Sequence, residues 1–226
     1  MTLWNSLFLE KSDIMNVPVI VSIILLISFS VAIPWMCRSI LWNRALKFLK
    51  NGKYDEAQEI FESKKFISLF GKFSSEWNLL RLALSRGDKY LIESKVNKIL
   101  NEDFKKSQRV TVAKAAYFYF LDLENKEMCQ KLLSVIQSSN DLKEVKQSEM
   151  LYRVIIEHKS DDIDFVLELL NDKKIEDVQK GLLQYILGLQ YLYSEDEKNS
   201  QKYLKKAKDN LKNTPYNSKV KKALGR

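Results

Sequence analysis

The side chains that could do chemistry are few in this sequence of 226 residues. It contains one histidine, His158, and two cysteines, Cys37 and Cys129. A zinc or catalytic site built from several His and Cys residues needs more of these side chains than the sequence has. We expect His158 near the C-terminal end of a helix, where the helix dipole favours a protonated imidazole at the surface. Both cysteines are expected to be free thiols.

A group of carboxylates follows His158, but its spacing does not fit a calcium loop. Asp161, Asp162 and Asp164 resemble half of such a loop, yet the required Gly and the terminal Glu at loop spacing are missing. We expect these acids at the N-cap and first turn of a helix. The sequence also lacks a Gly-rich phosphate loop, a nucleophile elbow and a metalloprotease helix. It therefore predicts no enzyme, no cofactor and no metal site.

The elements that would carry a function begin with an apolar segment near the N-terminus. No Asp, Glu, Lys or Arg occurs between Asp13 and Arg38. About 20 apolar residues in a helix cross a hydrocarbon core of roughly 30 Å. The sequence predicts a transmembrane helix at residues 14–37, after a short extracytoplasmic segment at residues 1–13.

Flanking charges predict the orientation of this helix. Residues 1–16 hold two acids and one Lys, whereas Arg38, Arg44 and Lys47 follow the apolar segment before any acid. Cytoplasmic flanks carry the excess of positive charge. The N-terminus is therefore expected outside and the rest of the chain in the cytoplasm. The high Lys, Asn and Ile content indicates an A/T-rich genome, which leads us to expect a bacterial plasma membrane. A receptor on a eukaryotic organelle, with the same N-terminal anchor and cytosolic repeats, is the alternative.

A cleaved signal peptide is the alternative interpretation of the apolar segment. Ser30, Val31 and Ala32 satisfy the small-residue rule for a cleavage site. The leading region lacks the positive charge of a signal peptide, so we favour the uncleaved helix.

After residue 38, apolar residues recur at three and four positions, which is typical of helices. In the segment 41–63, small residues would let two antiparallel helices approach and aromatic residues would fill the space beside them. This segment resembles the tetratricopeptide repeat (TPR), a helix–turn–helix unit. The residues that carry the resemblance are Ala45, Phe48, Gly52, Tyr54, Ala57 and Phe61.

Breaks in the helical pattern recur at intervals of 35 to 38 residues, at Gly52, Gly87, Asn125, Ser160 and Glu195. This spacing is close to the period of the TPR family. The last unit also resembles the motif, through Leu187, Gly188, Tyr191, Leu204, Ala207 and Pro215. Arg153 departs from it, because it occupies the place of a small residue. We predict an all-α chain with about five helical hairpins over residues 38–212. The resemblance implies a right-handed α-solenoid, and residues 213–226 are expected to cap it with a short helix.

The resemblance also implies a concave groove, lined by the first helix of each repeat, that holds a peptide or a helix of a partner protein. The expected groove residues are Trp42, Leu46, Trp77, Arg81, Tyr119, Tyr185 and Leu189. Trp, Tyr and Arg are enriched at interaction hot spots. The alternative is ordinary packing, with Trp42 at the membrane interface. Since Trp42 and Leu46 replace polar residues of the first repeat, we expect no clamp for a C-terminal carboxylate.

Positive charge concentrates at the C-terminus. Residues 197–226 contain nine Lys and one Arg against two acids, which equals the net charge of +8 of the whole chain. The candidate basic surface comprises Lys202, Lys205, Lys206, Lys219, Lys221 and Lys222. We favour a solvated helix face, with contact to anionic lipid or an acidic protein as the alternative. Nucleic acid is the weakest candidate, because no nucleic-acid module is present and Lys greatly outnumbers Arg.

Together these features predict a membrane-anchored TPR scaffold or adaptor on the cytoplasmic face of a membrane. Two alternatives remain open. One is a structural subunit of a secretion or envelope-assembly complex. The other is an extracytoplasmic, chaperone-like module, which follows if the topology is inverted or the apolar segment is cleaved.

Overall fold

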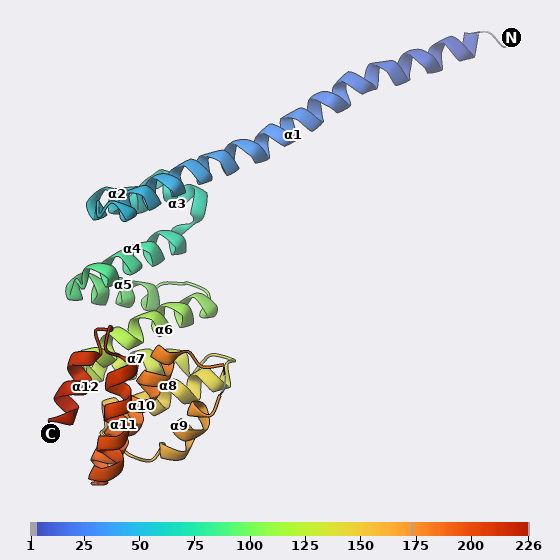
Figure 1. Ribbon diagram of the computed structural model, residues 1–226. Coiled ribbons are helices and arrows are strands. Elements are labelled where there is room, and N and C mark those ends of the chain that lie inside the picture. Colours follow the sequence, from blue (N-terminus) through green and yellow to red (C-terminus); the bar gives the residue numbers. More distant parts are fainter. Residues whose placement is uncertain (1–3, 173, 226) are drawn as a thin grey trace. The chain divides into compact units, whose positions relative to one another are not determined.

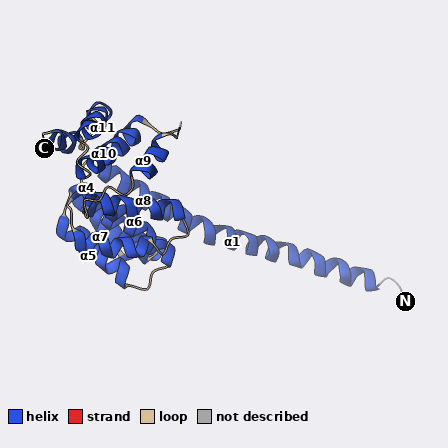
Figure 2. Cartoon of the chain, turned by 90° about the horizontal axis from the view of Figure 1, so that it is seen from below, coloured by secondary structure: helices blue, strands red, loops and turns tan. Residues whose placement is uncertain are grey.

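The computed structural model describes the backbone of residues 4–172 and 174–225, and the side chains of residues 4–20, 23–25, 27 and 31 lie outside the described part. Within the described residues every regular element is a helix and none is a strand (Figure 2). This confirms the predicted all-α class. The twelve helices are α1 (Trp4–Lys50), α2 (Tyr54–Glu62), α3 (Lys64–Phe70), α4 (Lys72–Arg86), α5 (Lys89–Asn101), α6 (Lys106–Asp122), α7 (Lys126–Ile136), α8 (Leu142–Ile155), α9 (Ile163–Leu170), α10 (Asp177–Tyr193), α11 (Glu197–Asn210) and α12 (Asn217–Leu224).

The chain divides into two compact units, residues 1–102 and residues 103–226. Unit 1 contains α1 to α5 and unit 2 contains α6 to α12 (Figure 1). Helical pairs α1–α2, α4–α5, α6–α7 and α10–α11 pack against each other within the units. The short helix α12 lies inside the segment predicted as a cap, whereas helix α3 was not predicted.

A left-handed residue recurs in the turn of each predicted repeat. Positive φ angles occur at intervals of 34 to 37 residues, at Gly52, Gly87, Glu124, His158 and Glu195. Three predicted turn positions therefore coincide with the left-handed residue, while Asn125 and Ser160 lie one and two residues after it. The turn of each repeat thus needs the same unusual backbone conformation, although only two of the five positions are Gly.

The residue after the left-handed one often begins the next helix. The amide of Asn125 donates to the carbonyl of Phe120 at 3.0 Å, and the amide of Asp196 donates to that of Tyr191 at 2.9 Å. These bonds close the preceding helix in the Schellman manner. The side chains of Asn125 and Asp196 then accept from the amides of Met128 and Asn199. Two adjacent residues therefore end one helix and start the next.

Replacing Glu124 or Glu195 with Gly is expected to raise the free energy of unfolding of unit 2 by about 1 kcal/mol each, because Gly adopts the left-handed conformation without a Cβ clash. The φ angles of these residues are 51° and 61°. Urea unfolding followed by circular dichroism measures the change. The control is Gly87→Ala in unit 1. Because Gly87 has a φ of 66°, we expect this variant to lower the free energy of unfolding. Stabilisation by Gly87→Ala, or destabilisation by both Gly variants, would contradict this account.

The C-terminal part of α1 packs into the core of unit 1. Ala45 is fully buried with Phe61 and Phe66. The ring of Trp42 lies 6.5 Å from that of Phe61 and 6.1 Å from that of Phe70. Small and aromatic residues therefore fill this core, as the repeat pattern predicted.

Before this core, α1 continues as one helix past α2 and α3 (Figure 1). Its described apolar side chains are exposed there, including Phe29 at 60%, Trp35 at 70% and Ile40 at 65%. Among the residues that the structure describes, no helix is long and apolar enough to span a membrane. The prediction of a membrane span at residues 14–37 falls in large part on side chains outside the described part. The prediction of an extracytoplasmic segment at residues 1–13 falls on such side chains entirely.

A buried carboxylate in unit 1 is neutralised by two lysines. Glu76 on α4 is only 6% exposed, and Lys98 and Lys95 of α5 donate to its oxygens at 2.6 and 3.1 Å. Burial alone would raise the pKa of the Glu76 carboxyl, but the hydrogen bonds and charges of the two lysines outweigh burial and lower it. The hydrogen bond from Lys98 to Glu76 likewise raises the pKa of the Lys98 ammonium.

This cluster predicts how the stability of unit 1 depends on pH. The lowered pKa of Glu76 contributes stability that is complete above the unfolded value near 4.3 and is lost as pH falls through the folded pKa. The raised pKa of Lys98 contributes stability that is lost only as pH rises above about 10.4. We expect Glu76→Gln to flatten the acid side of the urea-midpoint profile, and Glu59→Gln on α2 to leave it unchanged. An unchanged acid side in Glu76→Gln would contradict the assignment.

In unit 2, α8 and α9 are joined by a two-point ion pair. Arg153 Nε and Nη2 donate to Asp162 Oδ2 and Oδ1 at 2.8 and 2.6 Å. The amide of Asp162 donates to Oε1 of the buried Gln190 on α10 at 2.9 Å. The expected position of these acids is confirmed, because Asp162 is the N-cap residue of α9 and Asp164 lies in its first turn. The carboxylate of Asp162 makes no capping bond and binds Arg153 instead. This explains why Arg153 occupies a place where the repeat pattern has a small residue.

Helices α10 and α11 approach closely at two glycines. A Cβ added to Gly188 would lie 2.6 Å from Cγ of Leu204, and one added to Gly181 would lie 2.8 Å from Cγ of Leu211. The hydroxyl of Ser200 also donates to the Gly188 carbonyl at 3.0 Å. Both glycines therefore serve packing between helices rather than turning of the chain.

Candidate protein-binding groove

Unit 2 encloses a hollow of about 730 Å³. Its walls come mainly from α6, α8, α10 and α12, the first helices of three successive predicted repeats and the C-terminal cap. The volume falls within the range of protein ligand pockets, about 300–1,000 Å³. We call this space the unit 2 hollow. It is lined by Phe118, Leu121, Asp122, Glu124, Lys143, Gln147, Met150, Leu151, Ile155, His158, Leu169, Asp172, Ile175, Gln179, Leu182, Leu183, Tyr185, Ile186, Leu189, Tyr193, Tyr216, Lys219, Lys222 and Ala223.

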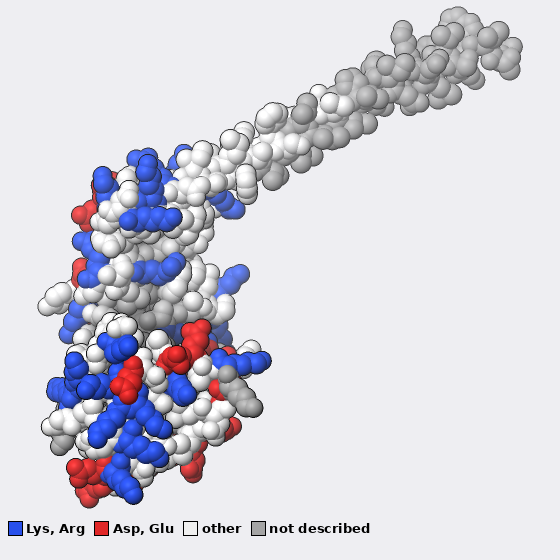
Figure 3. Space-filling view, viewed as in Figure 1, with Lys and Arg blue, Asp and Glu red and all other residues white. Residues whose placement is uncertain are grey.

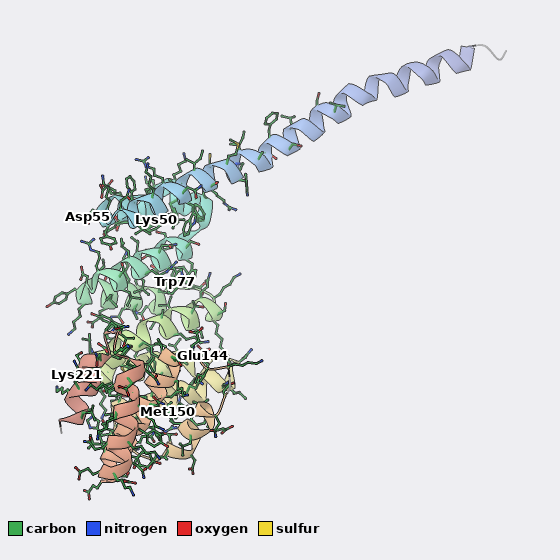
Figure 4. All side chains as sticks on the ribbon, viewed as in Figure 1. Lys50, Asp55, Trp77, Glu144, Met150 and Lys221 are labelled. Atoms are coloured by element: carbon green, nitrogen blue, oxygen red, sulfur yellow. The ribbon has the colours of Figure 1, made fainter. Side chains whose placement is uncertain are left out.

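Contacts beneath the hollow hold α6 and α8 in place. The hydroxyl of the fully buried Tyr117 donates to the carbonyl of Ser148 at 2.8 Å. Burial raises the pKa of Tyr117 far above its ordinary value, so this donor stays protonated. Lys114 forms an ion pair with Glu144 on the same two helices. Met150, on the wall of the hollow, and Glu144 are both labelled on α8 in Figure 4.

The lining side chains extend along two of the helices, α8 and α10. On α8 the lining side chains extend from Lys143 to Ile155, about 18 Å of helix, and on α10 from Gln179 to Tyr193, about 21 Å. Phe118 adds an aromatic ring that is 57% exposed.

An ion pair connects the two outermost walls. Lys219 Nζ on α12 donates to Oδ1 of Asp122 at 2.5 Å and to the Asp122 carbonyl at 3.0 Å, at the end of α6. These residues are 97 positions apart in the sequence. This ion pair joins α12 to the end of α6, and α12 lines one side of the hollow.

The structure brings two of the predicted groove residues to the hollow, Tyr185 and Leu189. Tyr119 lies on α6 beside the wall, but its neighbours Phe118, Leu121 and Asp122 line the space instead. The role of Tyr119 in a groove therefore stays a prediction.

The other four predicted groove residues belong to unit 1. Trp42 is half-buried and packs against Phe61 and Phe70 of the core, whereas the alternative interpretation placed it at the membrane interface. Leu46 is 36% exposed on α1. On α4, Trp77 is half-buried and Arg81 is exposed; Figure 4 labels Trp77.

The predicted basic residues of the C-terminus have three different environments. Lys202, Lys205, Lys206 and Lys221 are exposed on α11 and α12, where Figure 3 shows Lys and Arg gathered. The ammonium groups of Lys202 and Lys206 lie 5.2 and 5.9 Å from the ring of Tyr203. Lys219 binds Asp122, and Lys222 lines the hollow.

His158 is part of the site, which the sequence did not predict. It is exposed, as expected, but it lies at the rim of the hollow with its ring 5.0 Å from that of Tyr193. The one signal in the sequence was its place in a repeat turn, because turns follow the first helices that line a groove. Cys129 lies in the core, where burial raises the pKa of its thiol to about 12, so it is a poor nucleophile.

The unit 2 hollow combines apolar and charged side chains. Most of the lining side chains are Leu, Ile, Tyr and Phe. The charged side chains among them are Asp122, Glu124, Lys143, Asp172, Lys219 and Lys222. Such an apolar space with a few polar groups binds a ligand by burial of apolar surface and orients it by hydrogen bonds.

Comparison with known proteins does not add to this description. A scan against protein-family models and searches of the curated proteins and of the solved structures found no match to this chain.

Proposed function

We propose that this chain is a membrane-anchored, TPR-like scaffold that binds a segment of a partner protein in the unit 2 hollow. The observation that carries the proposal is the hollow itself, about 730 Å³ lined by the first helices of three successive predicted repeats. An α-solenoid with about five hairpins is the architecture that accounts for the recurring left-handed turns.

The membrane anchor rests on the sequence and on the described side chains of α1. Residues 14–37 carry no ionisable acid or base. The described apolar side chains in this stretch, among them Leu26 and Ile33, are exposed at 69% and 56%. A row of exposed apolar side chains on a helix is stable when lipid covers it.

The binding proposal is tested with two matched variants of the full-length chain, solubilised gently from native membranes. Phe118→Ala with Tyr185→Ala removes two rings of the hollow, while Tyr90→Ala removes a ring that is 87% exposed on α5 of unit 1. We expect the first variant to lose the co-purified partner set and the second to retain it. A partner set that is unchanged in both variants would remove the hollow from the function.

A photo-crosslinking amino acid at position 118 then identifies what the hollow holds. One recurring segment of one partner supports the scaffold. Crosslinks only between this chain and a fixed neighbour, at constant stoichiometry, favour the structural-subunit alternative.

Topology is tested by labelling an introduced cysteine with an impermeant maleimide. Leu142 is 79% exposed, so Leu142→Cys in a Cys37→Ser background provides one accessible thiol, while Cys129 stays buried. We expect labelling only after cells are lysed. Labelling in intact cells would instead favour the extracytoplasmic, chaperone-like alternative.

A further inference from the structure

Helix α3 and its turn into α4 form a feature that the repeat pattern does not contain. The α3–α4 corner, defined as residues 69–73, reads Leu-Phe-Gly-Lys-Phe. Gly71 turns the chain there with a φ of 86°. The corner thus combines three large apolar side chains with one Lys in a single tight turn.

The corner is fastened to one short stretch of α1. Arg38 Nε donates to the carbonyl of Leu69 at 2.7 Å, and the guanidinium of Arg38 lies 5.8 Å from the ring of Phe70. The ring of Trp42 is 6.1 Å from the same Phe70 ring. The end of α3 therefore lies beside α1 between Arg38 and Trp42, a length of about 6 Å along the helix.

This stretch comes directly after the uncharged segment of α1. Arg38 is the first charged residue after Asp13. Trp35 and Met36, just before it, are 70% and 55% exposed. Aromatic rings beside Arg and Lys are typical of the layer where lipid headgroups meet the hydrocarbon core.

The opposite end of α4 provides a reference point away from this layer. Arg86, at the end of α4, donates to Asp55 at 2.9 Å, and Asp55 follows the end of α1 at Lys50. Figure 4 labels Lys50 and Asp55 close together. Arg86 is therefore level with the end of α1, about 18 Å along the helix from Arg38.

We propose that the α3–α4 corner lies on the membrane surface, in the headgroup layer beside the point where α1 leaves the bilayer. The partner of this surface is the bilayer itself, contacted by the corner and by Ile67 of α3, which is 37% exposed. The inference rests on the proposed membrane span. As a consequence, unit 1 contacts the membrane through the α3–α4 corner as well as through α1.

The test uses fluorophores on single introduced cysteines in the full-length chain, reconstituted in vesicles of phosphatidylcholine and phosphatidylglycerol. The background is Cys37→Ser, and the buried Cys129 thiol, with its pKa of about 12, stays unlabelled. Ile67→Cys and Ser68→Cys report on α3, Phe29→Cys reports on the span, and Tyr90→Cys is the control at the far end of α4. All four positions are exposed, so labelling should preserve the fold, which circular dichroism checks.

Quenching by a lipid with a nitroxide on its headgroup reads the position of each fluorophore. We expect the α3 reporters to be quenched several-fold more than the Tyr90 reporter, and the Phe29 reporter to emit as in hydrocarbon. If the Phe29 reporter is in hydrocarbon but the α3 reporters match the Tyr90 reporter, the corner contact is overturned and the span stands. If the Phe29 reporter is in water, both proposals fail. Strong and equal quenching at α3 and Tyr90 would indicate unspecific adsorption and overturn the corner contact.

Discussion

Asp162→Ala is expected to lower the free energy of unfolding of unit 2 by about 3 kcal/mol, because removal of one partner leaves a charge desolvated. Asp162 is 8% exposed, and it receives two hydrogen bonds from Arg153. The Arg153 side chain is 30% exposed, so water can hydrate it in part, which puts the loss at the lower end of the range for buried pairs. Urea unfolding of the full chain in detergent measures it, and hydrogen exchange should show the loss in α8 and α9.

The control is the double variant Arg153→Met, Asp162→Ala, which removes both charges. It should recover a large part of the loss, since no buried charge is left without a partner. A single variant that loses less than about 1 kcal/mol would place this pair among ordinary surface ion pairs.

Gly188→Ala is expected to destabilise unit 2 by about 1–2 kcal/mol, although Ala is the better helix former by about 1 kcal/mol. The added methyl group would lie 2.6 Å from Cγ of Leu204, which is fully buried, and 3.2 Å from its backbone nitrogen. Helices α10 and α11 must therefore move apart. The change should be measurable as a lower urea midpoint.

Gly225→Ala is the matched control for this prediction. A Cβ there would be no closer than 3.8 Å to a neighbouring atom. We expect its urea midpoint to equal that of the wild type. If Gly188→Ala is as stable as Gly225→Ala, the close approach of α10 and α11 does not contribute to stability as argued.

The sequence predicted the helices and the repeat turns because both depend on local interactions. A Gly or Asn after an apolar helix, followed by a capping side chain, marks a turn with little help from the rest of the fold. Helix α3 was missed because the local signal that separates it from α2 is weak. Its boundary is Ser63, whose hydroxyl accepts from the amide of Phe66, and no Gly or Pro separates α2 from α3.

The candidate site could be predicted only in part, because its walls depend on tertiary contacts. Helix α6 carries five successive large apolar residues from Tyr117 to Leu121, so helical periodicity cannot decide which of them faces the groove. The ion pair of Lys219 with Asp122 joins residues 97 positions apart, and no local pattern indicates it. Tyr185 and Leu189 line the hollow on α10, and their contact with a partner stays a prediction.

Helix α1 continues without interruption from the proposed membrane span into the first repeat. An α-helix turns about 100° and rises about 1.5 Å per residue, so one residue inserted just before Arg38 would rotate the first repeat by that angle about the axis of α1. Seven inserted residues would restore the rotational phase to within about 20° while lifting the repeat by about 10 Å. The length of this part of α1 therefore sets the direction in which the first repeat faces around the helix axis. An insertion of one residue mainly changes that direction, and an insertion of seven residues mainly changes the distance of the repeat from the membrane.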